Sequence, residues 1–524
     1  MTGNWDLRDE PWIPVRFADV AARVGLRELF HRAHEIEDLE LPVPPAASGL
    51  LRILAAMTAR IVRVGAERLD DRKRADSIED WLDLRDGVLA QGRFEAAAVD
   101  AYFDDEVPEG RFGLFHAERP FLQDPRLRTQ CVDAKGKPNP SGVNKLVFGR
   151  PTGVKGAVLF GHFTDGDPVP IPPAEAAWHL IAQLYYGPAG QCTPRRITTE
   201  KPGNGEAGPL RRSVSFHVWG PNLFTGLVLG VPAPSDQVDL DGEDLCPWED
   251  DLPDPLAPGP LTWPGRWLTG RARHAVLLVP SVDGNEVTDA YVTWSNRQSA
   301  SAVADPNVIL DMPKAGGAPF ARRADGQRAV WRDIDALLLK GNSQGRRPLV
   351  FDDLPSDCLS ALRVRAYGFD QDGQQRDSGW FEATTPPVLG WQQGVSDAAD
   401  AMALHVARCH QGAEEVGRRL DYAAKLAWKL STDPPEDPTA KVKIDDKKPG
   451  PWARAAVGHY WPAAERTFWQ LATPQQLDIP AHRPFVEVAL DALDAAMGSA
   501  GADLRGARAR SRARATIRAA VPHP

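Results

Sequence analysis

The residues that could do chemistry in this chain are scattered, and none of them forms a recognised catalytic motif. The nearest set is His116 with the acidic pair Asp352 and Asp353, which would offer a base and two carboxylates to a metal-dependent hydrolase of nucleic acid. The sequence alone does not show that these side chains converge. No Walker A, H-E-x-x-H, D-F-G or G-x-S-x-G pattern occurs. We therefore expect no catalytic residue and no enzyme, with the hydrolase kept as an alternative.

The cysteines argue against a bound metal. They lie far apart in the sequence and form no C-x-x-C pair: Cys131, Cys192, Cys246, Cys358 and Cys409. We expect no metal, no cofactor and no disulfide framework, which suits a reducing cytoplasm. The N-terminal residues lack the basic and apolar regions of a secretory signal, and no long apolar run predicts a membrane span.

Charge is unevenly distributed along the chain. The net charge is −10 over 524 residues, which argues against a protein that coats nucleic acid without preference. Near the C-terminus, however, Arg505, Arg508 and Arg512 recur at helical spacing as one basic stripe, and Arg514 follows. We take Arg508, Arg512 and Arg514 as candidate contacts to the DNA backbone. A solvated helix face is the alternative reading of the same pattern.

Four polar stretches contain glycines, in a part of the chain that shows no catalytic motif. They cover residues 152–156 (Thr-Gly-Val-Lys-Gly), 187–190 (Gly-Pro-Ala-Gly), 203–208 and 367–376. Glycine lets a backbone approach another polymer closely, and amide or basic side chains suit phosphates and base edges. Each loop taken alone is more often an ordinary turn. Together they favour a protein that reads nucleic acid without reacting with it.

The elements that must position these loops change in kind along the chain. Up to Pro386-Pro387 the pattern is mixed, with helices expected at 47–66, 78–90, 93–103, 173–186 and 327–340, and strands at 12–17, 213–219, 275–280, 290–294 and 362–367. In the first helix we expect Arg52, Arg60 and Arg63 to form a solvated face. Beyond 386, long helices at about 395–432, 452–472, 482–499 and 502–519 are joined by short loops, which predicts an antiparallel bundle.

Several stretches carry a resemblance to one known family. The most specific is Phe115-His116-Ala117-Glu118-Arg119-Pro120-Phe121-Leu122-Gln123. Others are Trp12-Ile13-Pro14-Val15-Arg16, Gly208-Pro209-Leu210-Arg211-Arg212, Gly220-Pro221-Asn222-Leu223-Phe224, Leu261-Thr262-Trp263-Pro264 and the run from Gly368 to Gln374. In this order they resemble the large subunit of the type I-E CRISPR Cascade complex, the CasA family, over most of the first 380 residues.

The resemblance implies a fold and a function. The expected fold is α+β, with a large mixed α/β domain over residues 1–385 and a C-terminal four-helix bundle over 386–524. The implied function is a non-catalytic subunit that recognises the protospacer-adjacent motif in double-stranded DNA and promotes strand separation and R-loop formation. The implied partners are the other Cascade subunits, a crRNA, the target DNA and a helicase-nuclease effector, with no membrane. A scaffold that binds only protein remains an alternative.

The resemblance also implies two DNA contacts. A hairpin tip that wedges into the duplex falls on Phe369, Asp370, Gln371, Asp372 and Gly373, with Gln371 as the tip. Opening a base step costs a few kcal/mol, which the inserted group has to offset. A loop that lies in the minor groove falls on Gly187, Pro188, Ala189 and Gly190. A larger side chain there would collide with the exocyclic amine of guanine.

A third implied element is a loop at about 140–163 that contacts the crRNA and a neighbouring subunit, with Lys155, Phe160 and His162 as its candidate residues. The chain departs from the family in two ways. It lacks the zinc-binding cysteine cluster of some members, and its motif strand, Trp294-Ser295-Asn296-Arg297-Gln298, lacks their motif-contacting lysine. Asn296 and Arg297 are the candidates to replace that lysine.

Overall fold

The chain divides into two compact units. The first is Met1–Ala329 with Gly341–Gly390, and the second is Val330–Lys340 with Trp391–Pro524. The division falls near the expected boundary at 386, but it assigns 330–340 to the second unit, whereas we expected that segment in the first domain. The structure is a computed structural model that describes residues 5–62, 78–152, 162–198, 200–240, 242–297, 303–313, 317–340, 346–372, 376–435, 442–477, 479–501 and 503–519.

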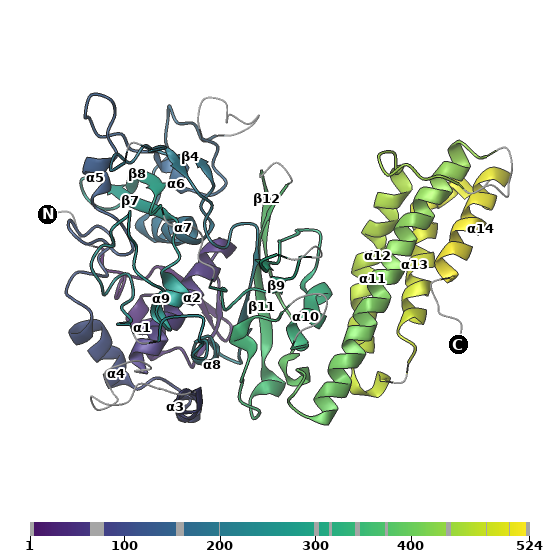
Figure 1. The fold of residues 1–524 in the computed structure, drawn as a ribbon, viewed down its shortest axis with the longest axis horizontal. Helices are drawn as coiled ribbons and strands as arrows, with labels where there is room; N and C mark the ends of the chain where they lie inside the picture. The colour runs from purple at the N-terminus through teal and green to yellow at the C-terminus, as the bar shows by residue number, and fades with distance from the viewer. Residues whose placement is uncertain are drawn as a thin grey trace. The chain divides into compact units, whose positions relative to one another are not determined.

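Two helices form the centre of the first unit. Helix α2 (Pro44–Ile61) packs against helix α7 (Pro173–Tyr186), as Figure 1 shows, and each begins with a proline in its first turn. A Cβ atom on Gly49 of α2 would lie 2.6 Å from Ile181 Cγ2, so the glycine permits this close approach. The bounds of α7 are the predicted ones, because a first-turn proline and the Gly187-Pro188 stop mark both of its ends.

The basic face expected on α2 is not solvated. Arg52 is 1 % exposed, and its Nη2 lies 2.8 Å from Asp305 Oδ1 and donates to Ser215 Oγ. Arg60 donates to Glu249, with 2.7 Å from Nη2 to Oε2. The sequence-based expectation was wrong here, because both acidic partners come from distant loops. A buried cation requires such a partner. The third residue, Arg63, lies outside the described residues.

A three-stranded antiparallel sheet carries the loop expected at 367–376. Strand β11 (Arg363–Gln371) is its centre, between β12 (Asp377–Thr384) and β6 (Val214–Trp219), with Phe369 opposite Trp380. The other strands form smaller sheets: β1 (Ile13–Phe17), β2 (Val20–Val24) and β3 (Ile36–Leu39) in the order β2-β1-β3; β7 (His274–Pro280) with β8 (Val287–Trp294); β4 (Gly190–Gln191) with β5 (Asn204–Gly205); and β9 (Leu310–Asp311) with β10 (Phe320–Ala321).

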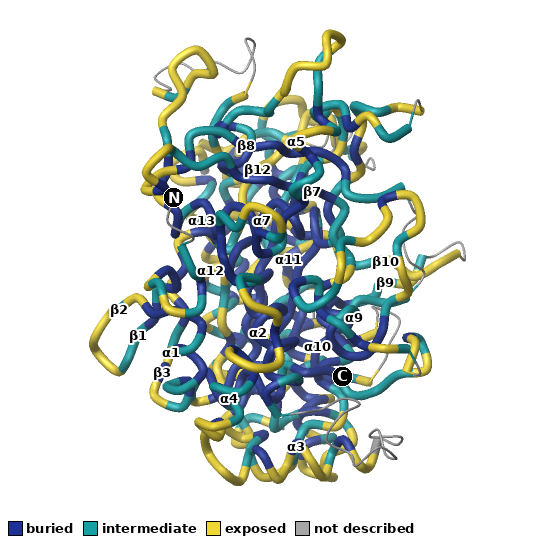
Figure 2. Tube along the Cα trace, turned by 90° about the vertical axis from the view of Figure 1, so that its left-hand side faces the viewer, coloured by how far each residue is buried: buried dark blue, intermediate teal, exposed yellow. Residues whose placement is uncertain are grey.

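Shorter helices fill the rest of the first unit. They are α1 (Leu26–His31), α3 (Ile78–Gln91), α4 (Ala96–Ala101), α5 (Leu127–Gln130), α6 (Val143–Leu146), α8 (Leu223–Leu229) and α9 (Gly265–Thr269). The helix expected at 93–103 is thus split, since a π-helical turn (Tyr102–Glu106) follows α4. Figure 2 shows buried backbone along the central helices and exposed backbone in the connecting loops.

The second unit is the expected helical bundle. Its helices are α11 (Asp397–Thr432), α12 (Pro451–Leu471), α13 (His482–Met497) and α14 (Leu504–Arg518), which lie side by side in Figure 1. Ser396 caps α11 by accepting from the Ala399 backbone N–H. The observed fold confirms the α+β class with a helical C-terminal region. No described helix combines the length and the apolar character that a bilayer crossing needs.

Residues 330–340 add a short segment to the bundle. We expected one helix over 327–340, and the structure instead shows a 3₁₀ turn (Val330–Asp333) followed by α10 (Ile334–Leu338). Trp331 is fully buried, and its ring lies 4.7 Å from that of Phe468 on α12. Arg332 lies over Trp461 and donates to Glu414 of α11. These contacts explain why the segment belongs to the second unit.

Candidate nucleic-acid interface

The glycine loop at 187–190 leaves helix α7 with a sharp change of direction. The Gly187 N–H donates to Gln183 O at 3.0 Å, which closes the helix, and a Cβ at this residue would lie 2.5 Å from His274 Nδ1. Gly190 has φ +110°, a conformation that favours glycine, and a Cβ there would meet no atom within 4 Å. Gly187 is therefore closely packed against the protein, whereas the space beside Gly190 is open.

His274 fixes the middle of this loop. Its Nε2 lies 3.0 Å from the Pro188 carbonyl oxygen. Burial lowers the pKa of His274 to about 4, so the ring is neutral at pH 7 and its Nε2–H donates to that carbonyl. No pattern in the sequence indicated this role, because His274 lies 86 residues from Pro188.

A second glycine-containing turn runs beside the first. Gly190 pairs with Gly205 and Gln191 with Asn204 in the β4–β5 ladder. The Gly187 carbonyl accepts from the Gly208 N–H at 2.9 Å. The structure thus brings together two of the four glycine-containing stretches that the sequence singled out, whereas the one at 152–156 lies mostly outside the described residues.

Of the two motif-strand candidates, Arg297 bonds the second turn and Asn296 bonds a carbonyl outside it. Arg297 donates to the carbonyls of Asn204 at 2.8 Å and Lys201 at 2.6 Å, and its guanidinium lies 3.8 Å from the Trp294 ring centre. Asn296 donates to the Ala272 carbonyl at 3.1 Å. Both side chains therefore bond backbone groups of the protein. Direct contact of either residue with the motif stays a prediction.

The β11–β12 hairpin contains the wedge residues, but not all of them are available at its surface. Phe369 is fully buried and stacks on Tyr186. Naming Phe369 as a DNA contact was wrong, because strand alternation turns this side chain into the core. Gln371 is half-buried and donates from Nε2 to Asp377 Oδ1 at 2.8 Å. Gly373 lies outside the described residues.

Two aspartates shape the end of the hairpin. Asp370 Oδ2 accepts from the Gly326 N–H at 3.1 Å. Asp372 Oδ1 accepts from the Arg376 N–H at 2.8 Å, and the Asp372 N–H donates to the Arg376 carbonyl at 2.9 Å. The Asp372–Arg376 bonds join the two ends of the hairpin strands, whereas the Asp370 bond ties β11 to the segment that contains Gly326.

One arginine that the sequence did not single out links the hairpin to the glycine loop. Arg211 donates to the Tyr186 carbonyl and to the Asp377 carboxylate, and its guanidinium lies 4.7 Å from the Phe369 ring centre. It appeared in the sequence only as part of the Gly208–Arg212 match. No local pattern could have paired it with Asp377, which lies 166 residues away.

Only part of the loop expected to contact the crRNA is described. Lys155 and Phe160 lie outside the described residues, whereas His162 is described and exposed. The segment before them packs on the hairpin: the Phe148 ring lies 5.9 Å from that of Phe369, and a Cβ on Gly149 would lie 3.7 Å from Trp380. The first part of this loop is therefore anchored beside the candidate wedge.

The C-terminal arginines divide into two groups. Arg505, Arg508 and Arg512 are exposed on α14. Arg514 forms an ion pair with Asp494 of α13, and the Arg510 side chain also lies near this carboxylate, at 3.7 Å. The sequence showed no acid within the stripe, so this partner from another helix was missed. Arg514 is consequently a weaker candidate for phosphate contact than Arg508 or Arg512.

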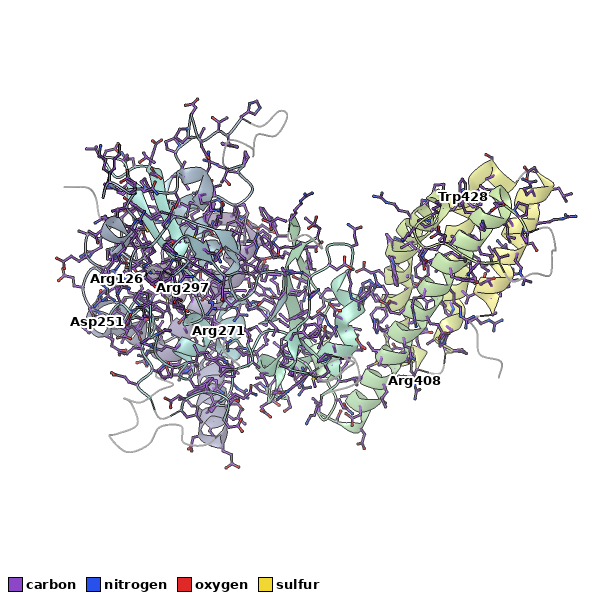
Figure 3. The ribbon with its side chains drawn as sticks, turned by 45° about the horizontal axis from the view of Figure 1, so that its top comes forward. Arg126, Asp251, Arg271, Arg297, Arg408 and Trp428 are labelled. Carbon is purple, nitrogen blue, oxygen red and sulfur yellow. The ribbon has the colours of Figure 1, made fainter. Side chains whose placement is uncertain are left out.

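A cavity of about 160 Å³ lies in the first unit, and Asn296 and His274 are part of its wall. Its charged lining is internally paired. Arg119 Nη1 lies 2.9 Å from Asp251 Oδ1, and Arg126 Nε lies 2.8 Å from Asp124 Oδ1. Figure 3 labels Arg126 and Asp251 on this unit. Because these cations already have carboxylate partners, the cavity is not an open anion site.

The residues of the alternative hydrolase have other partners. Asp352 accepts from Arg347 at 2.5 Å, the Asp353 carbonyl accepts from Arg85 at 2.6 Å, and His116 Nδ1 accepts from the Arg119 N–H at 3.0 Å. Within the described part of the chain, no group of three or more His, Cys, Asp and Glu side chains could hold a metal ion. This geometry does not favour metal-dependent hydrolysis.

Comparison with protein families identifies the chain. Residues 6–496 match the family model described as CRISPR-associated protein Cse1. The chain belongs to the Cse1 family. A curated Cse1 relative, the CRISPR-associated protein CasA/Cse1 of Thermus thermophilus, is 29% identical over 347 residues, which cover 64% of this chain and 60% of the relative. The match thus spans less than two thirds of that relative's length.

Solved structures resemble the Cse1 fold seen here. A chain of a CRISPR RNA-guided surveillance complex is 39% identical with a TM-score of 0.82, and the match covers 98% of this chain and 99% of that one. A chain of a surveillance complex described as pre-nicking is 38% identical with a TM-score of 0.72, at 98% coverage of both chains. Thermobifida fusca Cse1 is similar in fold, with a TM-score of 0.75 at 18% identity over 99% of this chain and 98% of that one.

Proposed function

We propose that this Cse1-family chain is the DNA-recognition subunit of a type I-E CRISPR Cascade complex. In that role it binds the crRNA-containing assembly, recognises the protospacer-adjacent motif in double-stranded DNA, and promotes strand separation and R-loop formation. It also helps recruit the helicase-nuclease and performs no catalysis itself. Family membership and the similarity to chains of RNA-guided surveillance complexes support the assembly part of this proposal.

One observation carries the DNA part of the proposal. The glycine loop and the β11–β12 hairpin are held next to each other, because Arg211 bonds both the Tyr186 carbonyl and Asp377. A loop of small residues, such as Gly-Pro-Ala-Gly, fits the narrow minor groove, where readout is largely limited to A·T against G·C. A neighbouring hairpin with an amide near its tip can then enter the adjacent base step. The two elements together suit recognition followed by opening.

The test uses the complex reconstituted with a crRNA. We expect Gln371→Ala combined with Gly373→Asp to slow R-loop formation on a matched target while the variant still assembles with the other subunits. Gln411→Ala, an exposed glutamine on α11, is the matched control and should behave like the natural chain. Unchanged R-loop formation by the double variant would contradict the wedge role.

Two further experimental outcomes would support a different function. Metal-dependent turnover of nucleic acid by the purified chain would favour the hydrolase. Complete absence of DNA binding by the assembled complex at low salt, where phosphate contacts are strongest, would favour a scaffold that binds only protein.

A further inference from the structure

The side chain of Arg211 is shared between two elements that are far apart in the sequence. Its Nη1 donates to the carbonyl of Tyr186, the last residue of α7 before the glycine loop, and its Nη2 donates to the carboxylate of Asp377, the first residue of β12. The flat guanidinium also faces Phe369 of β11. The Arg211 side chain is only 4 % exposed, so these groups take the place of its water.

The turn that contains Arg211 is also hydrogen-bonded to helix α7 and to strand β11. The Leu210 N–H donates to Tyr185 O at 3.0 Å, and the Phe369 N–H donates to Ser213 O at 3.2 Å. A Cβ on Gly208 would lie 2.5 Å from Tyr185 O, so this turn packs directly on the end of α7. Residues 208–213 therefore lie between the helix end and strand β11, with Arg211 at their centre.

Asp377 has a second partner, which is the candidate wedge residue. Its Oδ1 accepts both from Arg211 and from Gln371 Nε2, the latter at 2.8 Å. The Asp377 side chain is 49 % exposed, whereas that of Arg211 is buried. The Asp377 carboxylate therefore binds both the buried Arg211 guanidinium and the Gln371 amide near the hairpin tip.

We propose that Arg211 and Asp377 form a positioning pair that fixes the β11–β12 hairpin against the glycine loop and sets the resting direction of Gln371. This inference rests on the function proposed above and adds the residues that make its two DNA contacts act together. With the pair intact, groove binding and strand opening begin from a prearranged geometry. With the pair broken, the hairpin has to be ordered after the duplex binds, which slows opening.

The chemistry requires arginine at position 211. A guanidinium presents several N–H donors in one plane and stacks on an aromatic ring, so it can bond Tyr186 O and Asp377 while it faces Phe369. A lysine has a single ammonium group that cannot satisfy this geometry. Arg211→Lys therefore keeps the charge and removes the link, which makes it the most informative variant.

The first measurement uses the full-length chain without DNA. Hydrogen exchange followed by mass spectrometry reports on peptides from residues 186–191 and 363–384. We expect Arg211→Lys to speed exchange in both segments, and Asp377→Asn to do so mainly in the hairpin. Arg60→Lys is the matched control, since Arg60 is a mostly buried arginine of the same unit that bonds Glu249 instead. Unchanged exchange in either segment for Arg211→Lys overturns the proposal.

The second measurement is R-loop formation by the reconstituted complex. We expect Arg211→Lys to slow R-loop formation by about tenfold, with a smaller change in the initial binding of duplex. Asp377→Asn should slow it as well, and the double variant should be no slower than Arg211→Lys alone, because both changes break one link. Purely additive effects would show that the two residues act separately and would refute the pair.

The two measurements separate this inference from the function on which it rests. If the natural complex fails to open DNA, the proposed function is lost, but hydrogen exchange still decides whether the pair links the two segments. If the natural complex opens DNA and Arg211→Lys opens it equally fast, the pair is refuted and the function stands. If Arg211→Lys fails to fold, the same measurements are made on Asp377→Asn, because Asp377 is half-exposed and its replacement disturbs the core less.

Discussion

Phe369 and Tyr186 stack with their ring centroids 5.7 Å apart and their planes inclined by 27°, which joins strand β11 to the end of helix α7. Replacing Phe369 by Ala would leave a cavity beneath the hairpin. We expect the free energy of unfolding of the first unit to fall by about 3–5 kcal/mol. Hydrogen exchange of β11 peptides in urea measures this loss. Trp380→Ala should cost less, because that ring is 37 % exposed.

Gly190 tests whether the glycine loop meets DNA. Its φ of +110° and the open space around its Cβ direction suit a backbone that faces a partner. We expect Gly190→Asp to weaken duplex binding in a gel-shift assay by at least about tenfold, since a carboxylate would be placed against phosphates. Gly190→Asn, which has the same size without the charge, separates repulsion from backbone strain. Natural affinity in the Asp variant would reject the placement.

The basic stripe on α14 should contribute to the salt dependence of DNA binding. If Arg508 and Arg512 contact phosphates, replacing both by Ala should make the salt dependence shallower. The negative slope of log affinity against log salt should shrink in magnitude by about two, close to one for each phosphate. Arg514→Ala is the control, because Arg514 already pairs with Asp494. A slope unaltered by the double change would remove the stripe from the interface.

His410 makes the stability of the second unit depend on pH. Its Nδ1 lies 3.5 Å from Asp335 and its Nε2 3.7 Å from Glu414. Burial by itself would lower the pKa of His410, but the nearby carboxylates of Asp335 and Glu414 outweigh it and raise the pKa to about 9. Protonated His410 therefore stabilises the folded state. This contribution is complete below the unfolded value of about 6.5 and is lost as pH rises towards 9.

The size of this pH effect can be checked with one variant. A shift from about 6.5 to about 9 corresponds to roughly 3–4 kcal/mol at most, because one unit is worth about 1.4 kcal/mol. Urea unfolding of the natural chain, followed by a signal from the bundle, should show stability falling across this range. His410→Gln should flatten the profile. An equally steep profile in that variant would assign the effect to another group.

Local patterns were sufficient for α7 and for the long bundle helices, but not for the segments at 93–103 and 327–340. The bounds of α7 could be predicted because Pro173 and Gly187-Pro188 mark its two ends within the sequence itself. The four bundle helices likewise follow from long apolar periodicity interrupted by polar, proline-containing stretches. The position of the hairpin could also be predicted, since a strand pattern precedes a polar turn.

Long-range partners could not be predicted in the same way. Nothing near Arg211 points to Asp377, and nothing near Arg514 points to Asp494, because these pairs form only once the chain has folded. The same holds for Arg52 and Asp305, which turned an expected solvated face into a buried ion pair. Phe369 was misjudged because a motif match does not reveal which side of a strand faces the core.

Residues 330–340 belong to the second unit, and this affects how the protein can be divided into fragments. The polypeptide passes from one unit to the other at three places: after Ala329, after Lys340 and after Gly390. A fragment that stops at 385 would retain Trp331, Ile334 and Leu337 without the surface that covers them, and would be prone to aggregate. A fragment beginning at 391 would lack these same buried apolar side chains. To express the two units separately, the eleven residues 330–340 have to be removed from the first unit and joined to the second, because a single cut leaves them in the wrong fragment.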